Sequence, residues 1–138
     1  MPQTDKSPNK EVFLVVDDEP DMCWALERIL KKNGFQCRIA FNAQEALALI
    51  RKRSFPLIFL DAKLPDMEGL DLAEAVRKAI PSLKIVVVSG YFYDDDPGIQ
   101  DAFRKGLISG FISKPFNNDE IIQTIEETLG VAKIEVPP

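Results

Sequence analysis

Five short apolar runs alternate with five amphipathic helical patterns along the chain, and this alternation restricts the fold more than any other feature. The runs at residues 11–16, 35–40, 55–60, 85–88 and 108–112 are rich in Val, Ile, Leu and Phe, and most are apolar at successive positions. Strands of this kind are buried on both faces, as in a parallel sheet with helices on each side. We therefore predict a doubly wound α/β domain with right-handed crossovers.

The helical patterns carry recognisable start signals. Asn42 and Asn117 are each followed by a glutamate three residues later, which is the spacing of a capping box. Asp96 before Pro97 predicts another helix start, with proline at the first helical position. Apolar residues then recur at helical spacing. We expect helices at about residues 20–33, 42–53, 72–80, 96–106 and 117–129.

Composition excludes several functional classes. The 138 residues form one domain's length, with 46% apolar and 28% charged residues and a net charge of −5. An acidic chain offers no electrostatic footprint for nucleic acid, and no apolar run approaches the roughly 20 residues that span a membrane. The N-terminus has no apolar signal core, so we expect a cytoplasmic protein. Without histidine, any chemistry must come from carboxylates, lysines and hydroxyls, and Cys23 and Cys37 are expected to fill the core.

The domain is expected to extend over residues 11–130. Residues 1–10 are polar and contain two prolines, which predicts a flexible N-terminal arm. Residues 131–138 follow the last helical pattern and are expected to be a tail or the start of a linker.

Polar residues follow four of the predicted strands directly. The first strand ends on Asp17 and Asp18, the third on Asp61 and the fourth on Ser89, and Lys114 follows the fifth. The carboxyl ends of parallel strands meet at one edge of a sheet, where open α/β sheets bind ligands. Each residue has an ordinary alternative role, as a helix cap, a turn residue or a surface lysine. Five such residues at the ends of four strands favour a shared site.

The chemistry open to such a site is narrow. Three clustered carboxylates raise one another's pKa unless a cation lies among them, and an all-oxygen cluster suits Mg²⁺. Once the metal and Lys114 neutralise the site, a carboxylate can act as a nucleophile toward phosphorus. Phosphoryl transfer needs mainly positioning and charge neutralisation, and therefore no base.

The motifs VVDDEP, LDAKLPDMEGLD, VVVSGY and FISKPF, in this order and at this spacing, resemble the receiver domain of two-component response regulators. The resemblance extends from about residue 12 to residue 129. It implies a flavodoxin-like five-stranded parallel sheet in the order 2-1-3-4-5 with five helices. It also implies a signalling switch that accepts a phosphoryl group from a phosphohistidine of a sensor histidine kinase or a histidine phosphotransfer domain. Such a domain takes part in its own phosphorylation and dephosphorylation but is not otherwise an enzyme.

The resemblance assigns roles to the residues at the strand ends. Asp61 corresponds to the phosphoacceptor. Asp17 and Asp18 correspond to the acidic pair that holds Mg²⁺ or Mn²⁺ together with Asp61 and the backbone carbonyl of Lys63. Lys114 corresponds to the lysine that contacts the phosphoryl group, and its peptide bond to the following proline is cis in this family.

The resemblance also implies a conformational switch. Ser89 would move toward the phosphoryl group, and the space that it leaves would let Phe111 turn inward. The helix at 96–106 and the strand at 108–112 would then present an altered surface to a partner. A phosphorylation-dependent dimer is a further expectation left open by the sequence.

Three further residues have roles that the sequence leaves open. Lys63 and Tyr91 occupy positions where the family tunes hydrolysis of the acyl phosphate, and we hypothesise that they prolong the phosphorylated state. The alternative is that both are ordinary loop residues. Trp24 lies outside the apolar stripe of its helix, near where receivers dock the phosphodonor, or it packs against a neighbouring helix. Aromatic residues at 91–93 and aspartates at 94–96 form either a partner surface or a helix start favoured by the helix dipole.

Three other functions fit the sequence less well than the receiver. A haloacid-dehalogenase-type phosphatase needs a second aspartate two residues after the nucleophile, where this chain has Lys63. A flavodoxin shares the topology, but the acidic loop after the first strand would repel a phosphate. A pseudo-receiver that only binds proteins would not need every acidic position filled. The sequence does not decide between a stand-alone receiver and one part of a longer regulator or hybrid kinase.

Overall fold

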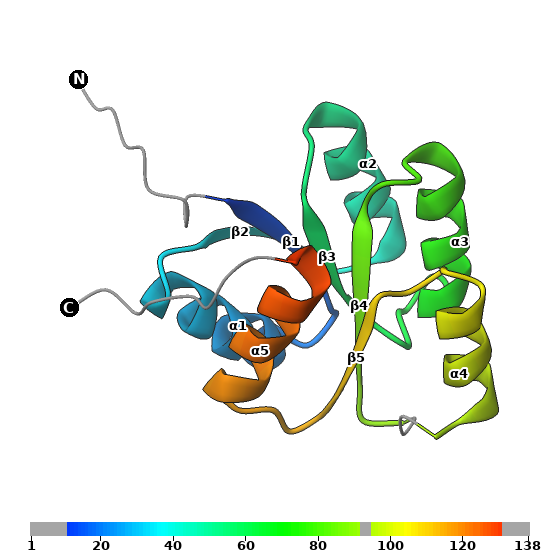
Figure 1. The fold of residues 1–138 in the computed structure, drawn as a ribbon. Coiled ribbons are helices and arrows are strands. Elements are labelled where there is room, and N and C mark those ends of the chain that lie inside the picture. Colours follow the sequence, from blue (N-terminus) through cyan, green and yellow to red (C-terminus); the bar gives the residue numbers. More distant parts are fainter. Residues whose placement is uncertain (1–10, 92–94, 131–138) are drawn as a thin grey trace.

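The computed structural model describes residues 11–91 and 95–130, and within them a five-stranded sheet is flanked by five helices (Figure 1). Every strand pairing is parallel and the strand order is β2-β1-β3-β4-β5, which confirms the predicted fold. The expected arm and tail lie outside the described residues. The strands are β1 (Val12–Val16), β2 (Gln36–Ala40), β3 (Leu57–Asp61), β4 (Lys84–Ser89) and β5 (Gly110–Ser113). The helices are α1 (Pro20–Lys32), α2 (Ala43–Lys52), α3 (Gly69–Ala79), α4 (Pro97–Arg104) and α5 (Asn118–Leu129).

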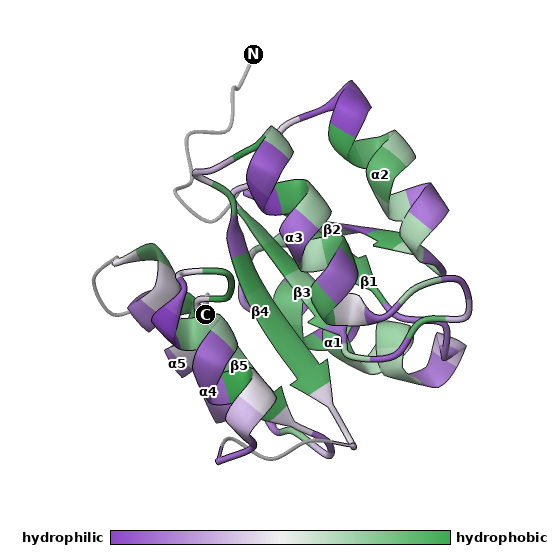
Figure 2. Cartoon of the chain, turned by 90° about the vertical axis from the view of Figure 1, so that its right-hand side faces the viewer, coloured by the Kyte–Doolittle hydropathy of each residue, from purple (hydrophilic) through white to green (hydrophobic). Residues whose placement is uncertain are grey.

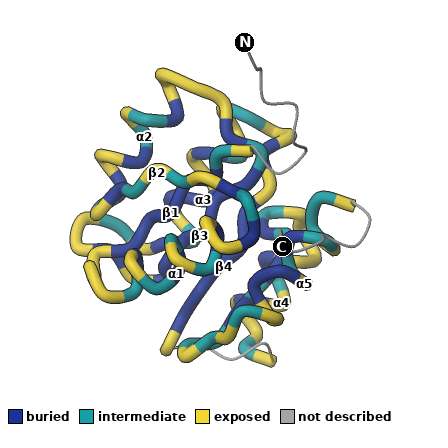
Figure 3. The backbone as a smooth tube through the Cα atoms, turned by 90° about the vertical axis from the view of Figure 1, so that its left-hand side faces the viewer, coloured by how far each residue is buried: buried dark blue, intermediate teal, exposed yellow. Residues whose placement is uncertain are grey.

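The strands divide the interior into two hydrophobic cores. Successive side chains of a strand point to opposite faces, so Ile58 and Leu60 of β3 face one core while Leu57 and Phe59 face the other. Helices α2, α3 and α4 cover the first face, and α1 and α5 cover the second. Figure 2 shows apolar central strands between helices that are polar on their outer surfaces, and Figure 3 shows the same strands buried. This double burial explains why the strands are apolar at successive positions.

Two strands begin two residues later than predicted. Strand β3 begins at Leu57 rather than at residue 55, because Pro56 has no N–H to donate to a neighbouring strand. Strand β5 covers Gly110–Ser113 rather than 108–112. The backbone N–H of Ile108 donates to the carbonyl of Ala102 at 3.3 Å, so this residue closes the end of α4 instead of joining the sheet.

Helix α3 begins at Gly69, three residues before the first apolar position of its predicted pattern. A Cβ atom at this position would lie 2.3 Å from the backbone oxygen of Asp61 and 2.9 Å from Cα of Ala62. No side chain tolerates such contacts with backbone. Glycine is therefore required here so that the start of α3 can pack directly against the end of β3.

The predicted caps are present, with one correction. Asn117 and Glu120 form a complete capping box, and Asp96 accepts hydrogen bonds from the first turn of α4. Asn42 accepts the N–H of Glu45 at 2.8 Å. The carboxylate of Glu45 accepts the N–H of Phe41, also at 2.8 Å, rather than that of Asn42. The start of α2 is therefore not the reciprocal pair that was predicted.

Two remaining expectations concern cysteines and membranes. Cys23 is buried and Cys37 is half-buried, and both thiols are free. Burial in the core is confirmed for Cys23 and holds only in part for Cys37. Among the described residues, each helix is too short or too polar to cross a membrane.

Candidate functional site

The carboxyl ends of β1 and β3 bring three aspartates together. Oxygen atoms of Asp17, Asp18 and Asp61 all lie within 4.8 Å of one another. Asp61 is only 4% exposed and Asp17 is also buried, whereas Asp18 reaches the surface. Strands β1 and β3 are direct neighbours in the sheet, with Val16 opposite Leu60, so the parallel register places the residues that follow them side by side. The predicted convergence of these acids is confirmed.

Lys114 extends into the same site from the end of β5. Its Nζ lies 3.0 Å from Oδ2 of Asp17 and 3.6 Å from Oδ1 of Asp61, and its side chain is 12% exposed. A third acid, Glu19, also reaches this ammonium group, at 3.2 Å through Oε1. The sequence interpretation missed Glu19, although it directly follows Asp18, because its position at the start of α1 gave no reason to expect it at the lysine.

The backbone at the end of β5 fixes the direction of Lys114. Its peptide bond to Pro115 is cis, as the resemblance implied. Its backbone N–H donates to the carbonyl of Ser89 at 2.9 Å, so the ends of β4 and β5 remain joined beyond the strands. This arrangement places the lysine beside the aspartates rather than on the surface.

The acidic cluster is electrostatically unfavourable as it stands. The pKa of Asp61 is raised to about 6, chiefly by burial and then by the charge of Asp17, while Lys114 opposes both effects. Burial alone would lower the pKa of Lys114, but the hydrogen bond to Asp17 and the charges of Asp17 and Asp61 outweigh it and raise this pKa. Lys114 therefore neutralises only part of the negative charge of the three aspartates.

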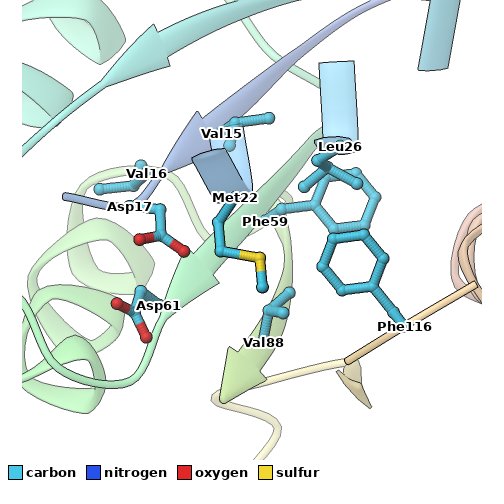
Figure 4. Close-up of a pocket in the computed structure, with 9 residues that line it drawn as sticks. All are labelled: Val15, Val16, Asp17, Met22, Leu26, Phe59, Asp61, Val88 and Phe116. Atoms are coloured by element: carbon cyan, nitrogen blue, oxygen red, sulfur yellow. The ribbon is translucent and has the colours of Figure 1, made fainter. Parts of the chain in front are cut away.

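An apolar wall next to the aspartates explains why Asp61 is poorly hydrated. In Figure 4, Asp17 and Asp61 lie beside Met22, and Phe59 and Phe116 close the far side of the hollow. This hollow measures about 10 Å³, so it has room for at most one water molecule.

The donor set fits a hard divalent cation. Three carboxylates supply oxygen atoms within reach of a common point, and two of these groups are buried. Mg²⁺ binds through carboxylates and keeps several of its waters, which suits a cluster with one exposed side. A divalent charge would also remove the repulsion that raises the pKa of Asp61.

Ser89 and Phe111 lie on the neighbouring strands. Ser89 is fully buried at the end of β4, one residue beyond Val88, which is the register partner of Asp61. Its Oγ accepts the N–H of Tyr91 at 2.9 Å. Phe111 is half-buried on β5 and lines a hollow of about 330 Å³ between α4 and α5, together with Phe103.

Lys63 and Tyr91 contact each other beside the site. The Nζ of Lys63 lies 5.8 Å from the centre of the Tyr91 ring and 3.9 Å from Oε2 of Glu68. Tyr91 is 68% exposed. The rest of the aromatic and acidic segment, residues 92–94, lies outside the described residues, whereas Asp96 caps α4 as the helix-start interpretation expected.

Trp24 is 58% exposed on α1, and the guanidinium of Arg28 lies 4.8 Å from the centre of its ring. It therefore does not pack against a neighbouring helix, which was one of the two alternatives. An exposed, stacked tryptophan is the kind of residue that anchors an interface.

Comparisons with known proteins give a consistent picture. A family model described as the response regulator receiver domain matches residues 13–126. The nitrogen assimilation regulatory protein NtrX of Azorhizobium caulinodans is 34% identical over 124 residues, which are 88% of this chain and 27% of that protein. The chain spans about a quarter of the NtrC and NtrX proteins that it matches.

Solved structures agree with these relatives. A CheY-like receiver domain protein from Methanospirillum hungatei superposes with a TM-score of 0.80 at 32% identity, covering 88% of this chain and 94% of that one. NtrX from Brucella abortus superposes with a TM-score of 0.79 at 36% identity, covering 88% of this chain and 27% of that one. By its sequence, its strand order and its acidic strand ends, the chain belongs to the response regulator receiver domains of two-component signal transduction.

Proposed function

We propose that this domain accepts a phosphoryl group on Asp61 from a phosphohistidine of a sensor histidine kinase or a histidine phosphotransfer domain. The observation that carries the proposal is the cluster of three carboxylates within 4.8 Å of one another, with the ammonium of Lys114 3.6 Å from Asp61. Receiver domains are not an enzyme family in themselves. Here the chain's own residues assist its phosphorylation and dephosphorylation.

The reaction is an in-line displacement at phosphorus. A carboxylate oxygen of Asp61 forms the new P–O bond as the P–N bond to the donor imidazole breaks, and the electron pair of that bond stays on the imidazole nitrogen. With a pKa of about 6, Asp61 is mostly ionised at neutral pH and needs no base. Lys114 stabilises the negative charge on the phosphoryl oxygens.

Asp17, Asp18, Asp61 and the backbone carbonyl of Lys63 would hold Mg²⁺ or Mn²⁺. When bound, the metal supplies charge neutralisation for both the acids and the phosphoryl group. The raised pKa of Asp61 supports this assignment, because its cluster contains more negative charge than Lys114 neutralises.

Phosphorylation would be relayed through Ser89 and Phe111. At rest, Oγ of Ser89 is held by the N–H of Tyr91 at 2.9 Å, and reaching a phosphoryl oxygen would exchange that bond for a stronger, charge-assisted one. Phe111 would then turn inward from its half-buried position, reshaping the hollow between α4 and α5. The altered α4/β5 surface is the proposed output, recognised by a partner or by a second copy of the chain.

Beryllofluoride with Mg²⁺ tests the proposal, because it forms a stable mimic of an aspartyl phosphate. We expect a stoichiometric complex and amide chemical-shift changes that extend from the ends of β1 and β3 to Phe111. Asp61→Asn is the matched control and should show no complex. Absence of a complex in the wild-type protein would refute phosphoacceptor function and favour a pseudo-receiver that only binds proteins.

One other function, that of a phosphatase with an aspartate nucleophile, has less support. A haloacid-dehalogenase-type phosphatase would turn over phosphate esters, yet the position two residues after Asp61 is occupied by Lys63, which cannot protonate a leaving group in the way an aspartate does. Release of phosphate from ester substrates in many turnovers would favour the phosphatase. The NtrX and NtrC relatives are about four times as long as the part that this chain matches, and the residues of the site do not determine the output of such a longer regulator.

A further inference from the structure

The loop that follows Asp61, residues 62–68, is closed on itself. The N–H of Leu64 donates to the carbonyl of Met67 at 3.2 Å, and the backbones of Lys63 and Glu68 form an isolated antiparallel β-bridge. The N–H of Gly69 donates to the carbonyl of Ala62 at 2.8 Å, so the base of the loop is fastened as well. This closure leaves the tip of the loop as the part that could still move.

The tip is fastened to another element. Both carboxylate oxygens of Asp66 accept backbone N–H groups from the first turn of α2, from Ala43 at 2.9 Å and from Gln44 at 3.1 Å. These N–H groups have no acceptor within the helix. The hydrogen bond from Ala43 is the main reason that the pKa of Asp66 is lowered, in keeping with a carboxylate that accepts on both oxygens.

Helix α2 also has local caps, so Asp66 is not the only residue that caps its first turn. Asn42 accepts the N–H of Glu45, and Glu45 accepts the N–H of Phe41. Asp66 instead joins two segments that are 22 to 23 residues apart in the sequence. Its contribution is a tether between the loop and the helix.

We propose that Asp66 is a positioning residue for the metal site, acting through the loop on the backbone carbonyl of Lys63. The proposal rests on the proposed function, in which that carbonyl is a metal ligand. Leu64 anchors the loop in the core next to Lys63, and Asp66 fixes its tip two residues further on. With both anchors in place, the carbonyl of Lys63 is held in one position before any metal arrives.

Mg²⁺ demands near-ideal octahedral geometry, so its affinity depends on how often all ligands are correctly placed. A loop without its tether would sample further conformations, and the apparent dissociation constant rises as the competent fraction falls. We expect Asp66→Ala to weaken Mg²⁺ binding about tenfold, the lower end of the effect of removing groups that orient metal ligands. Asp66→Asn keeps one acceptor oxygen and should give an intermediate loss.

The test compares this loss with that of a matched cap variant. Asn42→Ala removes the other side-chain acceptor at the start of α2 without touching the loop. The Mg²⁺ dissociation constant is measured by calorimetry, together with urea unfolding and amide exchange of residues 62–68. We expect both alanine variants to lower the urea midpoint, but only Asp66→Ala to weaken Mg²⁺ binding and speed exchange in the loop.

Two outcomes would overturn the inference. Equal Mg²⁺ affinity in Asp66→Ala and the wild type would mean that the tether does not position the ligand. An equal loss in Asn42→Ala would mean that Asp66 acts only through the stability of α2. If Asp66→Ala does not fold, the same comparison is made with Asp66→Asn. Failure of the wild-type protein to bind Mg²⁺ would instead refute the proposed function, and this inference with it.

Discussion

Replacing Asp61 by asparagine should make the metal-free domain more stable at neutral pH. Burial and the charge of Asp17 raise the pKa of Asp61 from 3.8 to about 6, against the opposing effect of Lys114. One pH unit of difference between the folded and unfolded pKa corresponds to about 1.4 kcal/mol, so ionised Asp61 destabilises the folded state by about 3 kcal/mol. Asparagine has a similar shape and carries no charge, and it removes this cost.

The pH dependence has a definite sign. Between pH 3.8 and about 6 the folded state retains a proton that the unfolded state has released. The contribution of Asp61 to stability therefore falls as the pH rises through this window and is constant above it. The stability gained by Asp61→Asn should be near zero below the window and reach about 3 kcal/mol at pH 7.5.

Urea unfolding in EDTA, followed by Trp24 fluorescence at several pH values, measures this difference. Glu74→Gln, at an exposed position on α3, controls for the loss of one negative charge and should change stability by less than about 0.5 kcal/mol. Mg²⁺ should stabilise the wild type and leave Asp61→Asn largely unchanged. If Asp61→Asn were no more stable than the wild type at pH 7.5 in EDTA, the electrostatic description of the site would be wrong.

Four further predictions concern other parts of the molecule. Gly69→Ala should destabilise the domain by about 3 kcal/mol or more in urea unfolding, because the Cβ of alanine would lie 2.3 Å from the backbone oxygen of Asp61. A loss of less than about 1 kcal/mol would contradict this reasoning. Arg77→Met should lower the free energy of unfolding by about 2 kcal/mol in the same assay. The guanidinium donates to the carbonyls of Pro81 and Leu83 after α3 and of Leu107 after α4, and the substitution leaves these carbonyls without that donor. Arg77→Lys should recover only part of this loss. Lys63→Asn combined with Tyr91→Ala should shorten the lifetime of the aspartyl phosphate, because the two side chains contact each other on the loops that follow Asp61 and Ser89; an unchanged dephosphorylation rate would leave them as ordinary loop residues. Trp24→Ala should slow phosphotransfer from the donor protein while sparing phosphorylation by acetyl phosphate, and equal loss of both would argue against docking at α1.

The sequence allowed the fold to be predicted because the three central strands, β1, β3 and β4, are buried on both faces and almost entirely apolar. It also predicted which acids converge, because parallel strands place their carboxyl ends on one edge. The start of β5 was predicted two residues too early, since Ile108 is as apolar as a strand residue but is used to close α4. The pattern of apolar residues in a short segment does not show whether a residue at its end belongs to the strand or closes the preceding helix.

Three residues at or near the site were beyond prediction for the same reason. Glu19 reaches Lys114 across 95 positions of sequence, and Asp66 reaches α2 across more than 20. The requirement for glycine at position 69 comes from its contact with the backbone oxygen of Asp61. Each depends on distances between segments that become adjacent only after the sheet has formed.

The two separate cores have a consequence for how such a domain can diversify. Helix α1, which carries Trp24, lies on one face of the sheet, and α4 lies on the other. The side chains that support one helix do not pack against the other, so a change that suits a new donor on α1 need not disturb the packing beneath α4. The strand ends around Asp61 are where the two faces meet. Under the proposed roles of α1 in docking the donor and of α4 and β5 in the output, exchanging α1 with that of another receiver should redirect the input while the α4/β5 surface keeps its original form.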